Sequence, residues 1–139
     1  MSNDKTKTKV KVKLGKRPEV FAEVPVEFEM VAGEGQVGIV PVTFKYRTRT
    51  EFGALVNEMH SAAGVNPGLR DDGTVDFEQV HQVLGGRAAA HLLKSIDSWG
   101  LDEDLSLDNL VDLCDAMPGA ATALMRAYAS LCTEGRLGN

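Results

Sequence analysis

The spacing of the apolar residues changes once along the chain, near Thr48, and this change constrains the fold more than any other feature. Before Thr48, apolar and polar side chains alternate, a two-residue period typical of β-strands with one buried face. After it, apolar residues recur at steps of three and four, which predicts amphipathic helices. The sequence therefore predicts an α+β fold: a small antiparallel N-terminal β-sheet with one packed helix, followed by a C-terminal helical bundle.

Three segments, residues 5–14, 20–30 and 38–48, show the two-residue alternation. The first has five lysines on one side and Thr, Val and Leu on the other, so we expect a strand with its lysine face in water. Pro25 cannot donate a backbone hydrogen bond, and its strand is expected at an edge of the sheet, or bulged there. The side chains expected to face the core are Val24, Val26, Phe28 and Met30 in the second strand and Val40, Val42, Phe44 and Tyr46 in the third.

A helix is predicted directly after the third strand. Thr48 and Glu51 match the capping box that opens many helices, and Thr50 is a competing N-cap. An apolar stripe follows at helical spacing, and Gly64 is expected to end the helix. The members of this stripe are Phe52, Leu55, Val56, Met59 and Ala63.

Turn-forming residues dominate positions 65–74, which predicts a loop between two parts of the chain. We therefore divide the chain into a β-sheet subdomain with its first helix at 1–64, the loop at 65–74, and a helical subdomain at 75–139. Residues 76–97 predict either one helix or two helices that meet at the glycine pair 85–86, and the sequence leaves both alternatives open.

Two more helices are predicted after a linker, SWGLDEDLS, at residues 98–106. Ser106 is expected to cap a short helix that ends near Ala116. Pro118 is well placed to open the last helix, and Gly135 to end it. The inward-facing side chains are expected to be Leu107, Leu110, Val111 and Cys114 in the short helix and Ala121, Leu124, Met125, Tyr128, Leu131 and Cys132 in the last.

Charge is divided unevenly along the chain, whose net charge is -5. Residues 1–49 hold ten basic and six acidic side chains, a balance of +4, whereas residues 50–139 hold five and fourteen, a balance of -9. Opposite signs in the two halves suggest two interaction surfaces. The sequence contains no apolar run long enough to span a membrane, no secretory leader and only two cysteines, so we expect a reducing cytoplasm.

No motif of catalysis, metal binding or cofactor binding is recognisable. The spacings of His60, His81 and His91 and of the two cysteines match no metal signature. The acidic run 102–104 lacks the ligand spacing of a calcium loop, and the glycines around position 35 lack the Lys-Ser/Thr of a phosphate loop. We therefore expect a protein without enzymatic activity, metal or cofactor.

The most conspicuous charged motif is FKYRTRTEF at residues 44–52, in which Lys45, Arg47 and Arg49 alternate with other residues. Together with the lysines of residues 5–13 they predict a basic sheet face, the kind of surface that binds phosphates. The acidic chain and the aromatics on the opposite face favour a solvated face that pairs with Glu23, Glu27 and Glu29. A nucleic-acid-binding regulator stays as the alternative, and a protein partner with an acidic helical surface is a third.

Several motifs together resemble a known family. They are LGKRPEVF, FKYRTRTEF, SWGL, the proline-opened MPGAATALMRAYASL and the final Gly-Asn. Over residues 14–139 the chain resembles the tail assembly chaperones of long-tailed bacteriophages and prophages. The resemblance implies a non-enzymatic protein of the bacterial host cytoplasm that binds the tape measure protein, keeps this long helical polypeptide soluble and helps tail-tube subunits polymerise around it.

This resemblance directs the choice of candidate partner-binding residues. A helical client needs an apolar groove, and methionine and aromatic side chains suit an adaptable surface. The basic strand face would be a second site, for tail-tube protein or for another copy in a homo-oligomer. A structural component of the tail itself is a further alternative. The candidate residues are Lys45, Arg47, Arg49, Phe52, Trp99, Leu101, Met117, Met125 and Tyr128.

Overall fold

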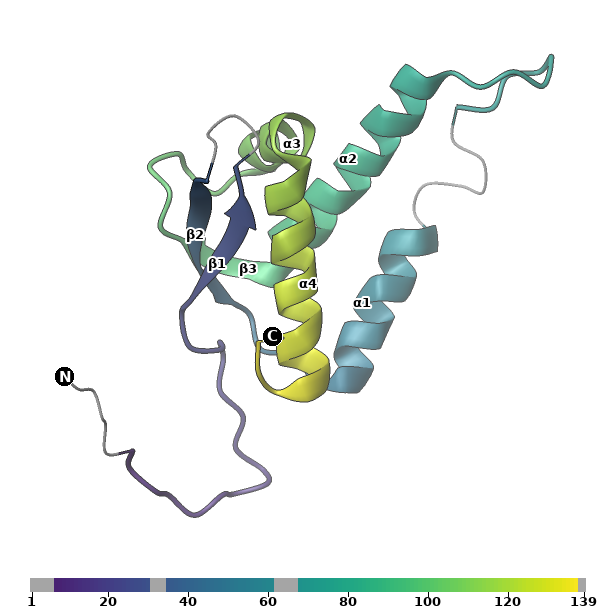
Figure 1. Ribbon diagram of the computed structural model, residues 1–139. Coiled ribbons are helices and arrows are strands. Elements are labelled where there is room, and N and C mark those ends of the chain that lie inside the picture. Colours follow the sequence, from purple (N-terminus) through teal and green to yellow (C-terminus); the bar gives the residue numbers. More distant parts are fainter. Residues whose placement is uncertain (1–6, 31–34, 62–67, 138–139) are drawn as a thin grey trace.

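The computed structural model describes residues 7–30, 35–61 and 68–137. The elements in chain order are β1 (Val24–Glu29), β2 (Val37–Phe44), α1 (Arg49–Ser61), α2 (Phe77–Ser95), β3 (Ile96–Trp99), α3 (Leu107–Ala116) and α4 (Pro118–Glu134). The strands form one antiparallel sheet in the order β1–β2–β3. Helix α4 runs beside the sheet, and α1 lies on the side of α4 away from the strands, whereas α2 passes behind α4 and leads into β3 (Figure 1). The predicted α+β class is confirmed.

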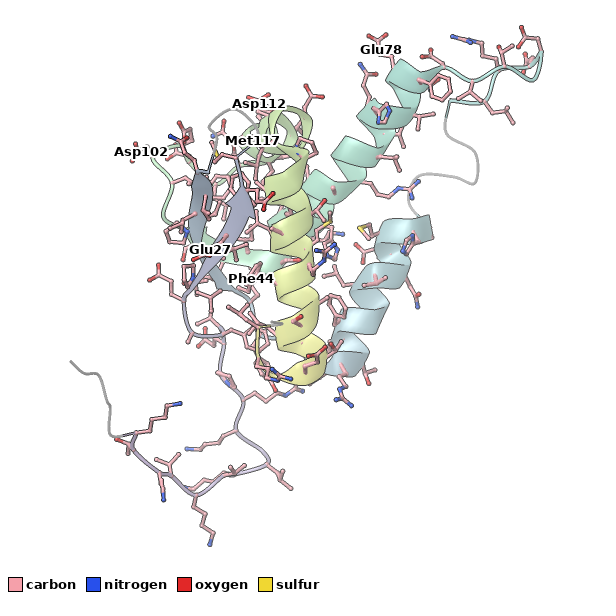
Figure 2. The ribbon with its side chains drawn as sticks, viewed as in Figure 1. Glu27, Phe44, Glu78, Asp102, Asp112 and Met117 are labelled. Atoms are coloured by element: carbon pink, nitrogen blue, oxygen red, sulfur yellow. The ribbon has the colours of Figure 1, made fainter. Side chains whose placement is uncertain are left out.

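The β1–β2 hairpin follows directly from the alternation in the sequence. Its register runs from Val24 opposite Val42 to Glu29 opposite Val37. Val26, Val40, Val42 and Phe44 are buried, whereas Glu27 points away from the body of the protein (Figure 2). In the described sheet β1 has a strand neighbour on one side only, as predicted for a strand that contains Pro25.

The expected first strand is wrong for the residues that can be judged. Residues 7–14 have no strand pairing, and Val10, Val12 and Leu14 are 80%, 79% and 97% exposed; residues 5 and 6 lie outside the described part. In place of the strand expected at residues 5–14, the sheet takes its remaining strand from β3, whose residues were predicted to be a helix end and a linker. Alternation indicates that a segment favours the extended conformation, but a strand also needs a neighbouring strand to pair with. Residues 96–99 have such a neighbour, because α2 ends where Ile96 lies opposite Phe44 of β2.

Helix α1 begins as the capping box predicts. The Glu51 N–H donates to Thr48 Oγ1 at 3.1 Å, and the Thr48 N–H donates to Glu51 Oε1 at 2.9 Å. Thr48 is therefore the N-cap, and the competing position Thr50 lies inside the helix. Leu55 is the buried member of the stripe and Phe52 is half-buried. The predicted end at Gly64 lies outside the described residues.

Helix α2 is a single helix that passes through Gly85 and Gly86, so the alternative of two helices is wrong. Asp76 caps it by accepting the N–H of Gln79 at 3.1 Å. Its C-terminal half is buried in the core, whereas its N-terminal half projects from the body (Figure 1). Consequently Phe77 and Leu84 on the predicted stripe are 69% and 45% exposed.

Helices α3 and α4 have the predicted ends. Ser106 Oγ accepts the Asn109 N–H at 3.1 Å, Pro118 is in the first turn of α4, and Gly135 ends α4 with a left-handed φ of 75°. The inward face of α3 is corrected, because Leu110, Leu113 and Cys114 are buried while Leu107 and Val111 are 46% and 39% exposed. The buried face of α3 is therefore the one at spacings of three and four after Leu110, and Leu107 and Val111 lie at the margin of this face.

One core joins the sheet to the helices. Its fully buried large side chains are Phe44, Leu92, Ile96, Leu110, Leu124 and Tyr128, which come from two strands and three helices. Helix α4 packs on β1 and β2 as well as on the other helices. The division at 1–64, 65–74 and 75–139 stays a prediction, but β3 shows that the sheet takes a strand from beyond residue 75.

We expect the substitution Gly86→Ala to raise the free energy of unfolding by roughly 0.5–1 kcal/mol, because glycine is unfavourable inside a helix. A Cβ added at Gly86 meets no atom within 4 Å, so alanine fits without strain. Urea denaturation of the two proteins measures the difference. A loss of stability would contradict a continuous helix at this position.

Candidate functional site

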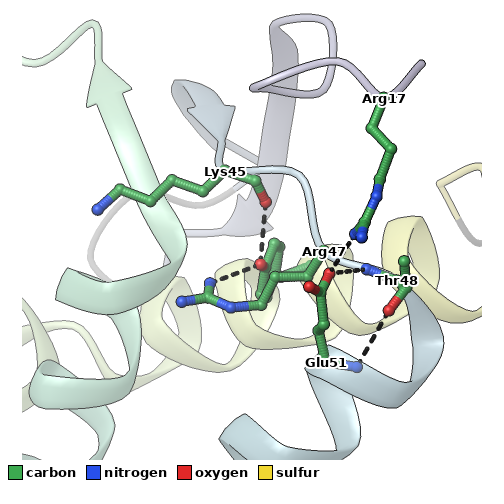
Figure 3. A network of polar contacts seen from close by, with 6 residues as sticks. Arg17, Lys45, Arg47, Thr48 and Glu51 are labelled. Atoms are coloured by element: carbon green, nitrogen blue, oxygen red, sulfur yellow. Dashed lines mark hydrogen bonds and ion pairs between the residues drawn. The ribbon is translucent and has the colours of Figure 1, made fainter. Parts of the chain in front are cut away.

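The residues of FKYRTRTEF hold the junction between β2 and α1 in place rather than forming a free basic face. The Arg47 guanidinium donates from Nη1 to the Lys94 carbonyl of α2 and to the Tyr128 hydroxyl of α4, both at 2.8 Å. The Tyr128 hydroxyl in turn donates to the Lys45 carbonyl at 2.9 Å (Figure 3). Arg49 donates from Nε to the Thr133 carbonyl near the end of α4 at 2.7 Å.

The expected pairing of this face with the β1 glutamates is therefore corrected. Within residues 7–30, 35–61 and 68–137, no ion pair joins Lys45, Arg47 or Arg49 to a glutamate of β1. Two of the three cations bond to helix carbonyls instead, and only Lys45 and Arg49 are exposed. Glu51 binds Arg17 at 3.0 Å, and the Thr48 N–H and the Arg17 guanidinium lower the pKa of its carboxyl.

Tyr128 is a core residue and not the accessible partner contact that was predicted. Its side chain is 0% exposed, and its ring packs against Phe44 and Phe52 with centroid distances of 4.9 and 5.6 Å. Burial raises the pKa of Tyr128 to about 12, against the opposing hydrogen bond from Arg47. Phe52 is only half-buried, but the face that it turns inward serves this aromatic cluster.

The other candidates lie in two places. Trp99 ends β3 and Leu101 follows it in the next loop; both are half-buried, and the indole Nε1–H donates to the Glu103 carbonyl at 2.8 Å. Met117 lies between α3 and α4 and is 41% exposed. Met125 is partly buried on α4 and lines a groove. The structure thus brings Lys45, Arg47, Phe52 and Tyr128 together at the junction, and places Met125 in the groove.

This groove, of about 370 Å³, lies where α2 meets the end of α3 and the start of α4. Small side chains of Gly85, Ala88 and Ala121 leave the space, while Leu84 is 45% exposed at its side. Burial raises the pKa of the Cys114 thiol, which therefore stays protonated and apolar here. We call it the helix groove; its lining is His81, Leu84, Gly85, Ala88, Cys114, Asp115, Pro118, Ala121, Thr122 and Met125.

Sequence reasoning missed the helix groove apart from Met125. The sequence does contain an indication of the groove. Small residues occur at helical spacing, namely Gly85 and Ala88 in α2 and Ala121 in α4, and the apolar stripe of α2 extends beyond the part of the helix that is buried in the core. An apolar stripe predicts that a helix face is buried. The sequence does not show which part of that face stays exposed, because this depends on how far α2 projects from the body of the protein.

Other hollows lie outside the helix groove. One of about 470 Å³ beside the junction is lined mainly by polar and charged groups such as Glu19, Lys45 and Asp97. Another of about the same volume is lined by apolar side chains such as Phe21 and Leu131 together with charged ones such as Arg49. A small one of about 70 Å³ lies between α1 and α2 beside His91. Burial, and the charges of Arg47 and His60 after it, lower the pKa of His91, whose Nδ1 has no hydrogen-bond partner among the described atoms.

In the part of the chain that the structure describes, the His, Cys, Asp and Glu side chains nowhere form a group of three or more that could hold a metal ion. None of its helices combines the length and the apolar character that a membrane span requires.

We expect Tyr128→Phe to lower the free energy of unfolding by about 1–2 kcal/mol, because the Lys45 carbonyl and Arg47 lose a buried partner. Tyr46→Phe is the matched control, since Tyr46 makes no hydroxyl hydrogen bond with a described residue. Urea denaturation at neutral pH measures both. Equal effects of the two substitutions would show that the hydroxyl network does not stabilise the junction.

The same tyrosine predicts a pH dependence. The folded state raises its pKa from 10.0 to about 12, so it holds the proton more tightly than the unfolded chain does. Its contribution to stability is fully present below pH 10 and is lost as the pH rises toward about 12. The stability difference between wild type and Tyr128→Phe should therefore shrink over this range. A difference that stays constant in alkaline urea titrations would contradict the raised pKa.

Comparison with known protein families matches residues 8–139 to one family, described as phage tail assembly chaperone. No curated protein and no solved structure matches the chain. The matched range covers every strand and helix of the structure, including the junction and the helix groove. The chain therefore belongs to the phage tail assembly chaperone family.

Proposed function

We propose that this chaperone binds the tape measure protein through the helix groove, keeps that polypeptide soluble in the bacterial cytoplasm and helps tail-tube subunits assemble around it. It does so by binding alone, without catalysis or a cofactor. The observation that carries the proposal is an apolar groove left open between α2, α3 and α4, with exposed Leu84 beside it. Grooves of this kind accept the apolar face of an amphipathic helix.

The surroundings of the groove suit a client that must stay in solution. Asp115 lies in the lining, and Asp108 and Asp112 are exposed on α3 nearby. Apolar contacts in the groove would hold the client, while the acidic side chains favour water and attract basic residues that flank a client helix.

The nucleic-acid alternative receives less support from the same geometry. Its proposed phosphate contacts included Arg47 and Arg49, whose guanidinium groups donate to carbonyls of α2 and α4. Breaking these bonds to reach phosphates would loosen the junction. A structural role in the finished tail is a distinct alternative, and the presence of the chain in purified particles would decide it.

The experiment compares Gly85→Glu with Gly86→Glu. Both positions are inside α2 and both tolerate a Cβ, but only Gly85 lines the groove. A carboxylate at Gly85 enters apolar space, so we expect the dissociation constant for the tape measure protein to rise by roughly tenfold or more, with little change for Gly86→Glu. Co-expression solubility and affinity capture of the tape measure protein are the measurements.

The outcomes separate the two parts of the proposal. The proposed function would be refuted if the tape measure protein were as insoluble with the wild-type chaperone as without it, and if the wild type captured none of it. Capture that both variants retain in full would refute the groove as the binding site and leave the function standing. Circular dichroism of both variants checks that α2 and the rest of the fold remain intact.

A further inference from the structure

The N-terminal segment of residues 7–14 has the pattern of a strand but lacks a partner in the described structure. Its lysines alternate with Thr8, Val10, Val12 and Leu14, and these last three side chains are 80%, 79% and 97% exposed. Exposed valine and leucine at two-residue spacing give an apolar side that a neighbouring sheet would cover. The sequence of the segment therefore favours a β-strand, but no described strand of the same chain pairs with it.

The chain just after this segment is fixed to the body and directs the segment away from it. Arg17 binds Glu51 at the start of α1 at 3.0 Å. The Phe21 N–H donates to the Phe44 carbonyl at 2.9 Å, and the Tyr46 N–H donates to the Glu19 carbonyl at 3.0 Å. Figure 1 shows residues 7–14 leading away from the sheet below these anchors. The segment is thus presented outward, where a second molecule can meet it.

The outer edge of β1 offers a matching site. β1 pairs with β2 on one side only, and the Met30 N–H donates to the Gln36 carbonyl next to the ladder at 3.0 Å. Because backbone groups alternate in direction, those of Glu27 and Glu29 face the open edge. Pro25 lacks an N–H there but keeps its carbonyl. An edge of this kind accepts an added strand.

Charge and apolar contacts on β1 complement those of the segment. Glu27 and Glu29 are exposed at two-residue spacing on the sheet face away from the helices. Lys9, Lys11 and Lys13 have the same spacing. On the opposite face Val24 and Phe28 are only half-buried, and Val10, Val12 and Leu14 would extend that apolar surface. The other free edge, β3, has four residues and fits an eight-residue strand less well.

We propose that residues 7–14 of one copy of this chain add as a strand to the β1 edge of a second copy, so that the protein self-associates. The lysines of the segment then lie beside Glu27 and Glu29 across the new strand pair, and the valines cover the half-buried apolar side chains of β1. This surface is distinct from the helix groove, and the proposal does not depend on the client.

Sedimentation velocity of the full chain is the first test, with wild type expected to contain species heavier than a monomer. Deletion of residues 1–14 should leave only monomer. Val12→Pro, which removes a backbone N–H and disfavours regular pairing, should weaken self-association by roughly tenfold or more. Val12→Ile is the matched control and should leave it intact. The segment makes no strand contact with the described residues of its own chain, so circular dichroism should be unchanged.

A charge exchange locates the edge. Lys9→Glu/Lys11→Glu/Lys13→Glu should be monomeric alone and should form a mixed complex with Glu27→Lys/Glu29→Lys. The matched control partner is Asp102→Lys/Glu103→Lys, which makes the same charge change on the loop after β3. If the lysine-to-glutamate variant bound the control partner as tightly as it binds Glu27→Lys/Glu29→Lys, the β1 edge would be excluded as the binding site.

Two further results would overturn the proposal as a whole. One is a wild type that is monomeric at the highest concentration it tolerates, including the case in which the segment folds onto its own β1. The other is an oligomer that persists after residues 1–14 are removed. Salt should weaken the association if the lysine and glutamate rows contribute to it.

Discussion

The hydroxyl of Tyr128 is the interaction on which the arrangement of the sheet and helices depends. It donates to the Lys45 carbonyl at the end of β2 and accepts from Arg47, which also reaches the end of α2. One buried atom therefore ties a strand, a junction and two helices together, while the ring packs on Phe44 and Phe52. Such a network is stable only when every member has a partner, so its residues constrain one another. The α4 residues that line the helix groove precede Tyr128 by three to ten positions, so the groove takes its position from this anchor.

Local physics made much of the fold predictable. The capping box at Thr48, the N-cap Ser106, Pro118 in the first turn of α4 and the alternation in β1 and β2 each act within a few residues, and the structure has all of them. Strand β3 could not be predicted. It spans four residues, which are too few to show a two-residue alternation, and its position depends on where α2 ends. The segment of residues 7–14 shows the converse: a strong strand pattern does not supply a partner.

The candidate site was harder to predict, for a physical reason. The sequence shows that Arg47 is charged and that Tyr128 is amphipathic. It does not show that these two side chains, 81 residues apart in the chain, form a hydrogen bond with each other. Met125 was identified because methionine marks adaptable surface, and it does line the groove. The rest of the lining is small, and small residues carry little signal until the neighbouring helices are in place. A groove is a property of the space between helices, and helix spacing depends on tertiary packing.

The size of the groove bears on how such a chaperone would work. About 370 Å³ is near the lower end of ligand pockets, so one copy can enclose only a few side chains of a client helix. Under the proposed function, binding through one groove would be weak and reversible, which would suit release of the client when the tube forms. A long client with many apolar turns would need many copies to stay soluble. Strand exchange through residues 7–14 would link those copies, and linked weak sites hold a long polymer far more firmly than single ones do. Release would then require only that the growing tube compete with each groove in turn, since no single contact is strong.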